Sequence, residues 1–339
     1  FVARATAFAR SPGDRSKYAE VAHDEFDLAI WDTRGVALAS SDRMSIGRAM
    51  LEAGQFGAAR RWFERAAEED RQGDVHGRVD HTGIGTSLHN LGFCLSSQGQ
   101  FAEARGWFER AVEEHRQGDV LGRVDHSEVG RSLHNVGSCL FAQGQFAEAR
   151  GWFERAAEEH RRGDVLGRVD QSEIGRSLHN VGFCVFSQGQ FAEARGWFER
   201  AAEEDRQGDV HGRVDHSELG KSLHLVGFCL SSQGQFAEAR EWYERAAEEF
   251  RQGDVHRRVD HALLGWTTYR GALCLLELGQ LDEAHNHLMD AVAEMRLGDI
   301  HGRVNTERLA TSLDALADTL DRVGRPDDAR PHREEASRL

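Results

Sequence analysis

The sequence contains very little proline, few aromatic side chains and no long apolar stretch. Only 3 of its 339 residues are Pro and 8% are aromatic, whereas 29% are charged. Helix interiors exclude Pro and carry charged residues on their solvated faces, so this composition indicates a strongly helical protein rather than a β-rich one. No apolar run approaches the roughly 18 residues of a membrane span, and no signal-peptide pattern is present. We therefore expect a cytoplasmic protein that does not enter membranes.

Positive charge is also in short supply. Lys and Arg number 42 against 57 Asp and Glu, which gives a formal net charge of −15. Proteins that bind the phosphate backbone present a basic face, so nucleic acid is not an expected partner. A local basic groove is still compatible with this total.

One stretch of the sequence returns every 45 residues. The tripeptide Gly-Gln-Phe begins at Gly54, Gly99, Gly144, Gly189 and Gly234. A fixed period of 20 to 50 residues is the signature of a solenoid, in which each unit is one supersecondary element stacked on its neighbours. About seven such units cover residues 40–339, with a truncated capping unit at the end. Residues 1–39 lie outside the array, and we expect them to form a helical cap or the tail of an upstream module.

The cysteines follow the same period. They are Cys94, Cys139, Cys184, Cys229 and Cys274. Equivalent positions in stacked helix pairs lie roughly 10 Å apart, which exceeds the separation of about 7 Å that a disulfide tolerates between Cα atoms. The spacing therefore predicts reduced thiols in a helical core.

The unit formed by residues 125–163 predicts two helices. Asp125 can cap the first helix, and Glu128 is placed to complete a capping box. Apolar or small residues then recur at spacings of three and four, which puts them on one stripe of each helix. Gly144 ends the first helix, and Gly163 is expected to close the second in a left-handed conformation.

The repeated residues resemble the tetratricopeptide repeat. In one unit the pattern comprises Leu88, Leu91, Gly92, Leu95, Gly99, Phe101, Ala104, Phe108 and Ala111. The unit is 11 residues longer than the common unit of 34 residues, and it lacks the usual Pro after the second helix. Long units of this kind are similar to those of kinesin light chains and of bacterial sensor proteins. The resemblance implies an all-α, tetratricopeptide-like α-solenoid, a right-handed superhelix of antiparallel helix pairs that binds proteins or peptides.

The resemblance also implies that the first helix of each pair lines a concave face and directs its second, fifth, sixth, ninth and twelfth positions into a groove. The second position carries the cations Arg131, Arg176 and Lys221. The fifth carries His89, His134, His179 and His224, and the sixth carries Asn90, Asn135 and Asn180. The ninth and twelfth include Phe183, Phe186 and Phe228. These are the candidate partner-binding residues.

The candidate residues predict an extended, acidic partner. In the first helices of the central units, from Gly130 to Gln143 and in the equivalent segments, the only formal charges are the three cations. Cations and imidazoles select carboxylates, Asn side chains can hold a peptide main chain, and Phe rings can receive an apolar anchor. Protonation of the His side chains would then tighten binding as pH falls through their ordinary pKa of about 6.5.

Structural roles compete with these interpretations. The Asn and His residues can instead bond neighbouring helices, and the cations can pair with a capping acid of an adjacent unit. The Trp residues of the second helices fit a packing role better than a binding role. In the linkers between units, Asp and Arg recur together, as in Asp164 and Arg168. They predict a ladder of weak ion pairs between stacked linkers.

No metal, cofactor or catalytic site is predicted. The linker histidines His76, His81, His211, His216, His256 and His261 resemble metal ligands by type. Leu121, Leu166 and Gln171 replace them in other units, however, and a metal site does not tolerate such exchange. No His has a persistent acid partner at close spacing, and no Gly-rich loop has phosphate-cradle spacing.

The leading hypothesis is therefore a non-enzymatic scaffold for protein–protein interaction that binds an extended, acidic peptide. One alternative is the ligand-sensing, C-terminal array of a larger signalling protein, which regulates an upstream effector domain. Another is a structural or self-assembling spacer. The sequence identifies neither the ligand nor the oligomeric state.

Overall fold

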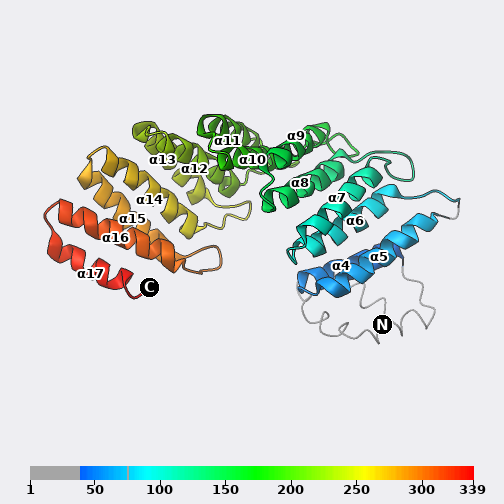
Figure 1. The fold of residues 1–339 in the computed structure, drawn as a ribbon, viewed down its shortest axis with the longest axis horizontal. Helices are drawn as coiled ribbons and strands as arrows, with labels where there is room; N and C mark the ends of the chain where they lie inside the picture. Colours follow the sequence, from blue (N-terminus) through cyan, green and yellow to red (C-terminus); the bar gives the residue numbers. More distant parts are fainter. Residues whose placement is uncertain (1–38, 75) are drawn as a thin grey trace. The chain divides into compact units, whose positions relative to one another are not determined.

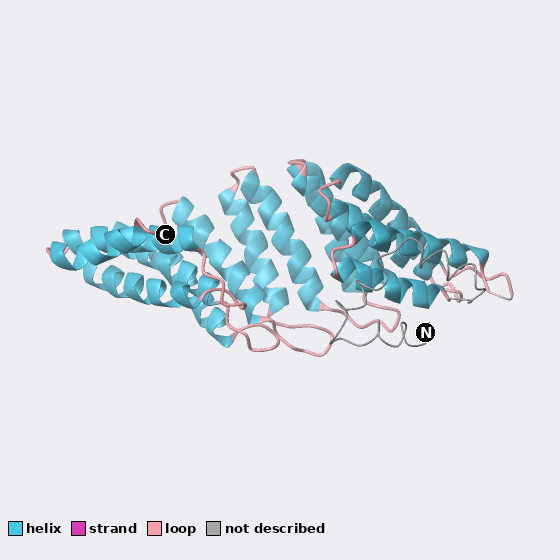
Figure 2. Ribbon diagram, turned by 90° about the horizontal axis from the view of Figure 1, so that it is seen from below, coloured by secondary structure: helices cyan, strands magenta, loops and turns pink. Residues whose placement is uncertain are grey.

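The computed structural model describes residues 39–74 and 76–339. Within that part of the chain every regular element is an α-helix (Figure 2). The helices are α4 (Ser40–Glu52), α5 (Phe56–Gln72), α6 (His81–Ser96), α7 (Phe101–His115), α8 (His126–Ala142), α9 (Phe146–Arg162), α10 (Gln171–Ser187), α11 (Phe191–Asp205), α12 (His216–Ser232), α13 (Phe236–Gln252), α14 (His261–Glu277), α15 (Leu281–Leu297), α16 (Thr306–Arg322) and α17 (Pro326–Ala336). The predicted all-α repeat solenoid is confirmed.

The chain divides into two compact units, which we call unit 1 (Phe1–Val169) and unit 2 (Asp170–Leu339). Unit 1 contains the helices α4 to α9, and unit 2 contains α10 to α17. Within each unit, helices that follow one another in the sequence pack side by side (Figure 1). Within a unit, the first helix of each pair therefore contacts its own second helix, which in turn contacts the first helix of the next pair in that unit.

The first helices α6, α8, α10, α12 and α14 begin where the sequence predicts, at an Asp cap. In α8 the carboxylate of Asp125 accepts hydrogen bonds from the backbone N–H groups of Ser127 (3.0 Å) and Glu128 (3.3 Å). This satisfies donors that a helix start leaves open. The second half of the expected capping box does not form here, because the Glu128 carboxylate pairs with Arg131 at 3.1 Å.

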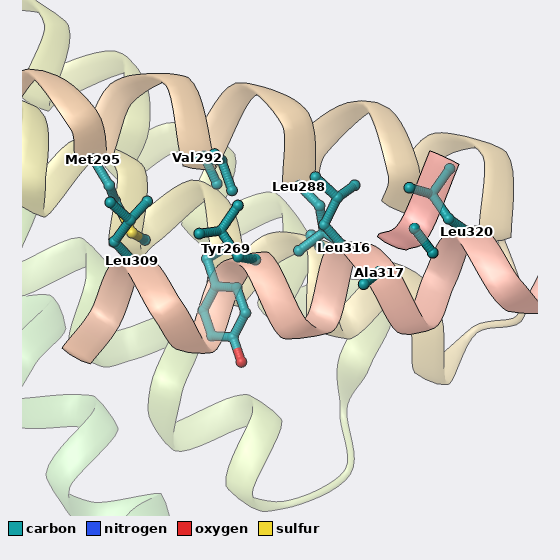
Figure 3. Close-up of a cluster of buried hydrophobic side chains, with 12 residues drawn as sticks. Tyr269, Leu288, Val292, Met295, Leu309, Leu316, Ala317 and Leu320 are labelled. Atoms are coloured by element: carbon teal, nitrogen blue, oxygen red, sulfur yellow. The ribbon is translucent and has the colours of Figure 1, made fainter. Parts of the chain in front are cut away.

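Apolar side chains of neighbouring helices form the core of each unit. In unit 2, Leu288 and Val292 of α15 pack against Leu309 and Leu316 of α16 (Figure 3). These four side chains are at most 3% exposed. Full burial of such side chains contributes about 1.5–3 kcal/mol each, so the stability of each unit comes mainly from this packing between helices.

All five cysteines are buried and unbridged. Burial raises the pKa of Cys94, Cys139 and Cys274 to about 11 and that of Cys229 to about 12. The prediction of free thiols in a helical core is confirmed. A thiol reacts through its thiolate form, so these groups are protected from reaction at neutral pH.

Each long linker is held closed by its own Asp and Arg. Asp164 accepts hydrogen bonds from the backbone N–H groups of Leu166 (2.8 Å) and Arg168 (3.0 Å). Its second oxygen accepts a hydrogen bond from Arg168 Nε at 2.7 Å. The same pattern recurs at Asp74, Asp119, Asp209, Asp254 and Asp299. The ion pairs lie within linkers, so the predicted ladder between linkers is wrong.

The glycine that ends the second helix has a different conformation from the one expected. Gly163 has φ 81° and ψ −177°, which lies outside the left-handed helical region and is accessible essentially to Gly alone. A Cβ atom there would come within 2.8 Å of the Arg168 carbonyl oxygen. Gly163 is therefore required because the linker folds back against it.

The N-terminal segment expected to form a cap, residues 1–39, lies outside the described residues except for Ala39, which precedes α4. Among the described residues, no helix combines the length and the apolar character that a membrane crossing requires.

Candidate functional site

The three candidate cations project from the first helices and are well exposed. The side chains of Arg131, Arg176 and Lys221 are 48%, 54% and 39% exposed. Each pairs with the glutamate three residues before it: Arg131 with Glu128 (3.1 Å), Arg176 with Glu173 (2.7 Å) and Lys221 with Glu218 (2.8 Å). The cations therefore pair with acidic residues of the helix start, as the structural interpretation proposed, but each acid lies in the same helix and not in an adjacent repeat.

The histidines at the fifth position link successive first helices. Their Nδ1 atoms lie within hydrogen-bond distance of a hydroxyl of the next first helix in three cases: His89 with Ser132 (3.0 Å), His179 with Ser222 (3.1 Å) and His224 with Thr267 (2.9 Å). Each ring also lies edge-on against an aromatic ring of its own second helix, as for His179 and Phe198 at 5.4 Å. These rings therefore connect three helices each.

Burial of these imidazoles removes the expected pH response. Desolvation lowers the pKa of His89 and His224 to about 3 and that of His179 to about 4. The three rings stay neutral from pH 8 to 5.5. Protonation of these three rings near pH 6.5 is therefore not expected, because burial disfavours their charged form.

The asparagines at the sixth position hydrogen-bond within the array. Asn135 Nδ2 lies 3.2 Å from His89 Nε2, across the interface between α8 and α6. Asn90 Nδ2 donates to the Thr86 carbonyl in its own helix at 3.0 Å. Asn180 and His134 occupy the equivalent places on α10 and α8, and the His134 ring lies edge-on to Phe153 at 5.0 Å.

A buried polar network, which the sequence reasoning missed, continues from these histidines. In unit 1, Ser132 Oγ also lies 3.3 Å from His115 Nδ1. In unit 2, Ser222 Oγ donates to Asp205 Oδ2 at 3.1 Å. The hydroxyl lies between the His179 ring and the acid, whereas a catalytic triad places His between the hydroxyl and the acid. The network is thus a hydrogen-bond chain through the core rather than a nucleophilic site.

The last members of the two networks have strongly shifted pKa values. Asp205 is 5% exposed and His115 is 1% exposed. Burial raises the pKa of Asp205 to about 7 and lowers that of His115 to about 4. A signal in the sequence could have found this position. In successive 45-residue repeats this position is occupied by Asp70, His115, His160, Asp205, Phe250 and Met295, while the flanking residues hardly change.

The candidate Phe residues of unit 2 pack on one another. The Phe186 ring lies 5.1 Å from Phe191 and 5.3 Å from Phe228, and Phe183 lies 5.6 Å from Phe198. Such edge and tilted contacts stabilise by about 0.5–1.5 kcal/mol beyond burial. These rings therefore fill the interface between α10 and α12.

At the equivalent interface of unit 1, between α6 and α8, serines replace two of these rings. Ser96 and Ser138 stand where unit 2 has Phe186 and Phe228. A cavity of about 250 Å³ opens there, which we call the unit 1 notch. It is lined by Phe93, Ser96, Ser97, Phe101, Phe108, Asn135, Ser138 and Cys139. Phe93 forms an exposed wall, with 45% of its surface accessible.

The histidines that open the first helices have acid partners that were not foreseen. The Nδ1 atom of His126 lies 2.7 Å from Glu159 Oε2 in the second helix of the same pair. His81, His216 and His261 make the same contact with Glu114, Glu249 and Glu294. Across residues 39–74 and 76–339, no group of three or more His, Cys, Asp and Glu is placed to hold a metal ion.

Sequence models of the tetratricopeptide repeat match most of the array. The matched segments are residues 47–65, 84–126, 129–163, 173–252 and 310–335. This chain belongs to the tetratricopeptide repeat family. The tetratricopeptide fold serves generally in protein–protein interaction. No curated protein sequence matches the chain.

Solved structures share the tetratricopeptide fold at low sequence identity. A signal transduction ATPase with numerous domains (STAND) from Pyrococcus horikoshii, which has a tetratricopeptide repeat sensor, is 12% identical with a TM-score of 0.68, over 88% of this chain and 41% of that one. BtubC (BKLC) from P. vanneervenii is 18% identical with a TM-score of 0.54, over 73% and 90%. Kinesin light chain-like repeats from Podosopora anserina are 19% identical with a TM-score of 0.47, over 62% and 95%.

The candidate residues all lie on first helices of tetratricopeptide pairs. His89 and Asn90 lie on α6; Arg131, His134 and Asn135 on α8; Arg176, His179, Asn180, Phe183 and Phe186 on α10; and Lys221, His224 and Phe228 on α12. The structure brings His89 next to Asn135 and Phe186 next to Phe228. Ser138 and Ser96, which open the notch, stand at the ninth and twelfth positions of their helices and were not among the candidate partner-binding residues.

Proposed function

We propose that this chain is a protein-interaction scaffold whose first helices bind an extended, acidic protein segment. The main support is the exposure of a cation at the same position of α8, α10 and α12. Arg131, Arg176 and Lys221 each have about two-fifths to half of their side chain accessible. Cations that recur every 45 residues at the same helix position suit carboxylates spaced along an extended chain better than a compact ligand.

The glutamate beside each cation does not prevent this binding. Exposed ion pairs contribute only about 0.2–1 kcal/mol, so a ligand carboxylate can displace the glutamate at small cost. The contact of Arg131 with Glu128 uses the single nitrogen Nη1. A guanidinium has five N–H donors, so a ligand carboxylate can engage the others.

The histidines and asparagines have a supporting role in this proposal. Contacts such as those of His89 with Ser132 and Asn135 fix the spacing between first helices. We infer that these rings position the cations and that they do not themselves bind the partner. Affinity should then stay flat from pH 8 to 5.5.

Selection from a random library of displayed 12-residue peptides tests the proposal. We expect peptides enriched in Asp and Glu to bind the wild-type chain. The triple variant R131E, R176E and K221E should lose this enrichment and bind a chosen acidic peptide at least about tenfold more weakly, a loss of 1.4 kcal/mol.

Three arginines at the C-terminal ends of second helices, two in the last turn and Arg206 just after it, provide a matched control. Arg71, Arg206 and Arg251 each pair with a glutamate three residues earlier, in the same geometry. The triple variant R71E, R206E and R251E changes the net charge equally and should retain acidic peptides. Equal losses in both variants would indicate a general charge effect, and enrichment without acidic residues would reject the proposal.

A second candidate function is a sensor array within a larger signalling protein. The similar array of the Pyrococcus horikoshii STAND protein is a sensor, and this chain covers 41% of that protein. An ATPase or DNA-binding domain encoded upstream of Phe1 in the complete gene would support this role. An open reading frame that encodes the array alone would reject it.

A further inference from the structure

The unit 1 notch is lined by residues of α6, α7 and α8, with the exposed Phe93 ring at its side. We propose that it receives the phenol ring of a tyrosine side chain from the bound segment. This inference rests on the proposed function, because the partner must be an extended segment that can present one side chain. The notch selects the ring by shape and its hydroxyl group by hydrogen bonding.

The shape argument comes from the same place in unit 2. There the chain fills the interface with its own Phe186 and Phe228 rings, 5.3 Å apart. In unit 1, Ser96 and Ser138 leave about 250 Å³ open beside Phe101. A cavity of about 150 Å³ lined by apolar side chains already holds a benzene ring, so the notch is large enough for an aromatic side chain.

Between α12 and α14 the same place is partly filled. Ser231 is retained there, but Leu273 stands where the notch has Ser138, and the cavity measures about 190 Å³. The cavity is thus smaller where Leu273 and Arg270 stand at the positions of Ser138 and Asn135. The notch exists because Ser96 and Ser138 have small side chains.

Two serine hydroxyls of the notch, those of Ser96 and Ser138, can only accept a hydrogen bond from a ligand. Ser96 Oγ donates its proton to the Phe93 carbonyl, and Ser138 Oγ donates to the His134 carbonyl, both at 3.0 Å. The Asn135 amide nitrogen is engaged with His89. Lone pairs on the two hydroxyl oxygens and on Asn135 Oδ1 are left to accept. A ligand ring that carries an O–H donor therefore fits better than an unsubstituted ring.

Unit 2 contains an internal precedent for this contact. Tyr243 stands at the position of Phe108, and its hydroxyl lies 3.3 Å from Ser231 Oγ. Ser231 in turn stands at the position of Ser96. In unit 2 the protein therefore already places a phenol hydroxyl next to the serine that is equivalent to Ser96 of the notch.

Ligand-observed NMR with N-acetyl-tyrosinamide as the probe tests the site. We expect weak binding to the wild-type chain, at least about threefold tighter than N-acetyl-phenylalaninamide, as one net hydrogen bond predicts. The variant S138F should reduce binding at least about tenfold, because Phe at this position fills the space. Phe already occupies the equivalent position at residues 93, 183 and 228, so the fold should tolerate it.

The variant S231F fills the smaller cavity of unit 2 and is the matched control; it should leave probe binding to the notch unchanged. Equal binding of the two probes, or full binding by S138F, would overturn the proposal. Helicity and melting temperature of both variants verify that they fold.

The outcome is separable from that of the proposed function. The probe has no carboxylate, so its binding does not depend on Arg131, Arg176 and Lys221. If acidic peptides bind while the probe does not, only the notch proposal fails. If the probe binds and charge reversal has no effect on peptides, only the acidic-partner proposal fails.

Discussion

Unit 1 and unit 2 end the same buried hydrogen-bond chain in different ways. In unit 1 the hydrogen bonds link His89 to Ser132 and Ser132 to His115. In unit 2 they link His179 to Ser222 and Ser222 to Asp205. The helices, the spacing and the central hydroxyl are the same. Either an imidazole or a protonated carboxyl can therefore end the hydrogen-bond chain at this position.

The two endings respond to pH with opposite sign. The pKa of His115 is lowered to about 4 by burial, so unit 1 loses stability as pH falls from about 6.5 to 4. The pKa of Asp205 is raised to about 7, mainly by burial, with Glu218 and Asp215 raising it further and Ser222 and Arg176 lowering it. The folded state then holds a proton that the unfolded state has released. This contribution is fully present below about pH 4 and is lost as pH rises to about 7.

The largest change in the free energy of unfolding should come from removing the buried phenylalanine of the second helix beside each network. Phe198 and Phe108 are equivalent and buried, and truncation to Ala typically costs about 3–5 kcal/mol. We expect F198A to lie at the upper end, since Phe198 also contacts Phe183, and F108A at the lower end, since Phe108 borders the notch. Denaturant unfolding measures both. A greater loss in F108A would contradict this order.

An intermediate effect is expected from Asp205. The variant D205N keeps an acceptor for Ser222 and removes the buried charge, so it should stabilise unit 2 by about 1–3 kcal/mol at pH 8 and change little near pH 4. Hydrogen exchange, corrected for the pH dependence of intrinsic rates, reports on each unit separately. The reciprocal variant H115D should give unit 1 the loss at high pH. A stability gain in D205N that is equal at both pH values would contradict the assignment.

The smallest effect concerns one linker of unit 2. Arg257 has φ 59°, a conformation in which Gly stands at 77, 122, 167, 212 and 302 in the other linkers. A left-handed residue other than Gly costs roughly 1 kcal/mol, so R257G should raise stability by about 0.5–1 kcal/mol. R251G, in the last turn of α13, is the control and should lower stability by a similar amount. Thermal unfolding distinguishes the two; a loss in R257G would contradict the strain argument.

The features that the sequence predicted are those set by local chemistry. The Asp caps, the helix ends and the buried cysteines follow from side chains that act within one helix or one turn. The 45-residue period then carried these local signals through the whole array. The fold class was therefore predictable without knowledge of any contact between helices.

The candidate site was less predictable because its properties arise between helices. The pKa of His179 depends on its burial against Phe198 and Ser222, which lie 19 and 43 residues away in the sequence. The notch depends on two serines in different helices, Ser96 and Ser138, and neither residue alone predicts a cavity. Comparison of the same position across units was the usable signal, and it points to Asp205 and to Ser138.

The closed linkers have a consequence for how such a chain can change in length. Each Asp–Arg linker satisfies its hydrogen bonds within five residues, as Asp164 does with Leu166 and Arg168. A duplicated 45-residue segment would bring its own linker, cap and core residues, and it would require no new partner at the junction. The gene can therefore gain or lose whole repeats in frame, and natural variants of this array are expected to differ by multiples of 45 residues.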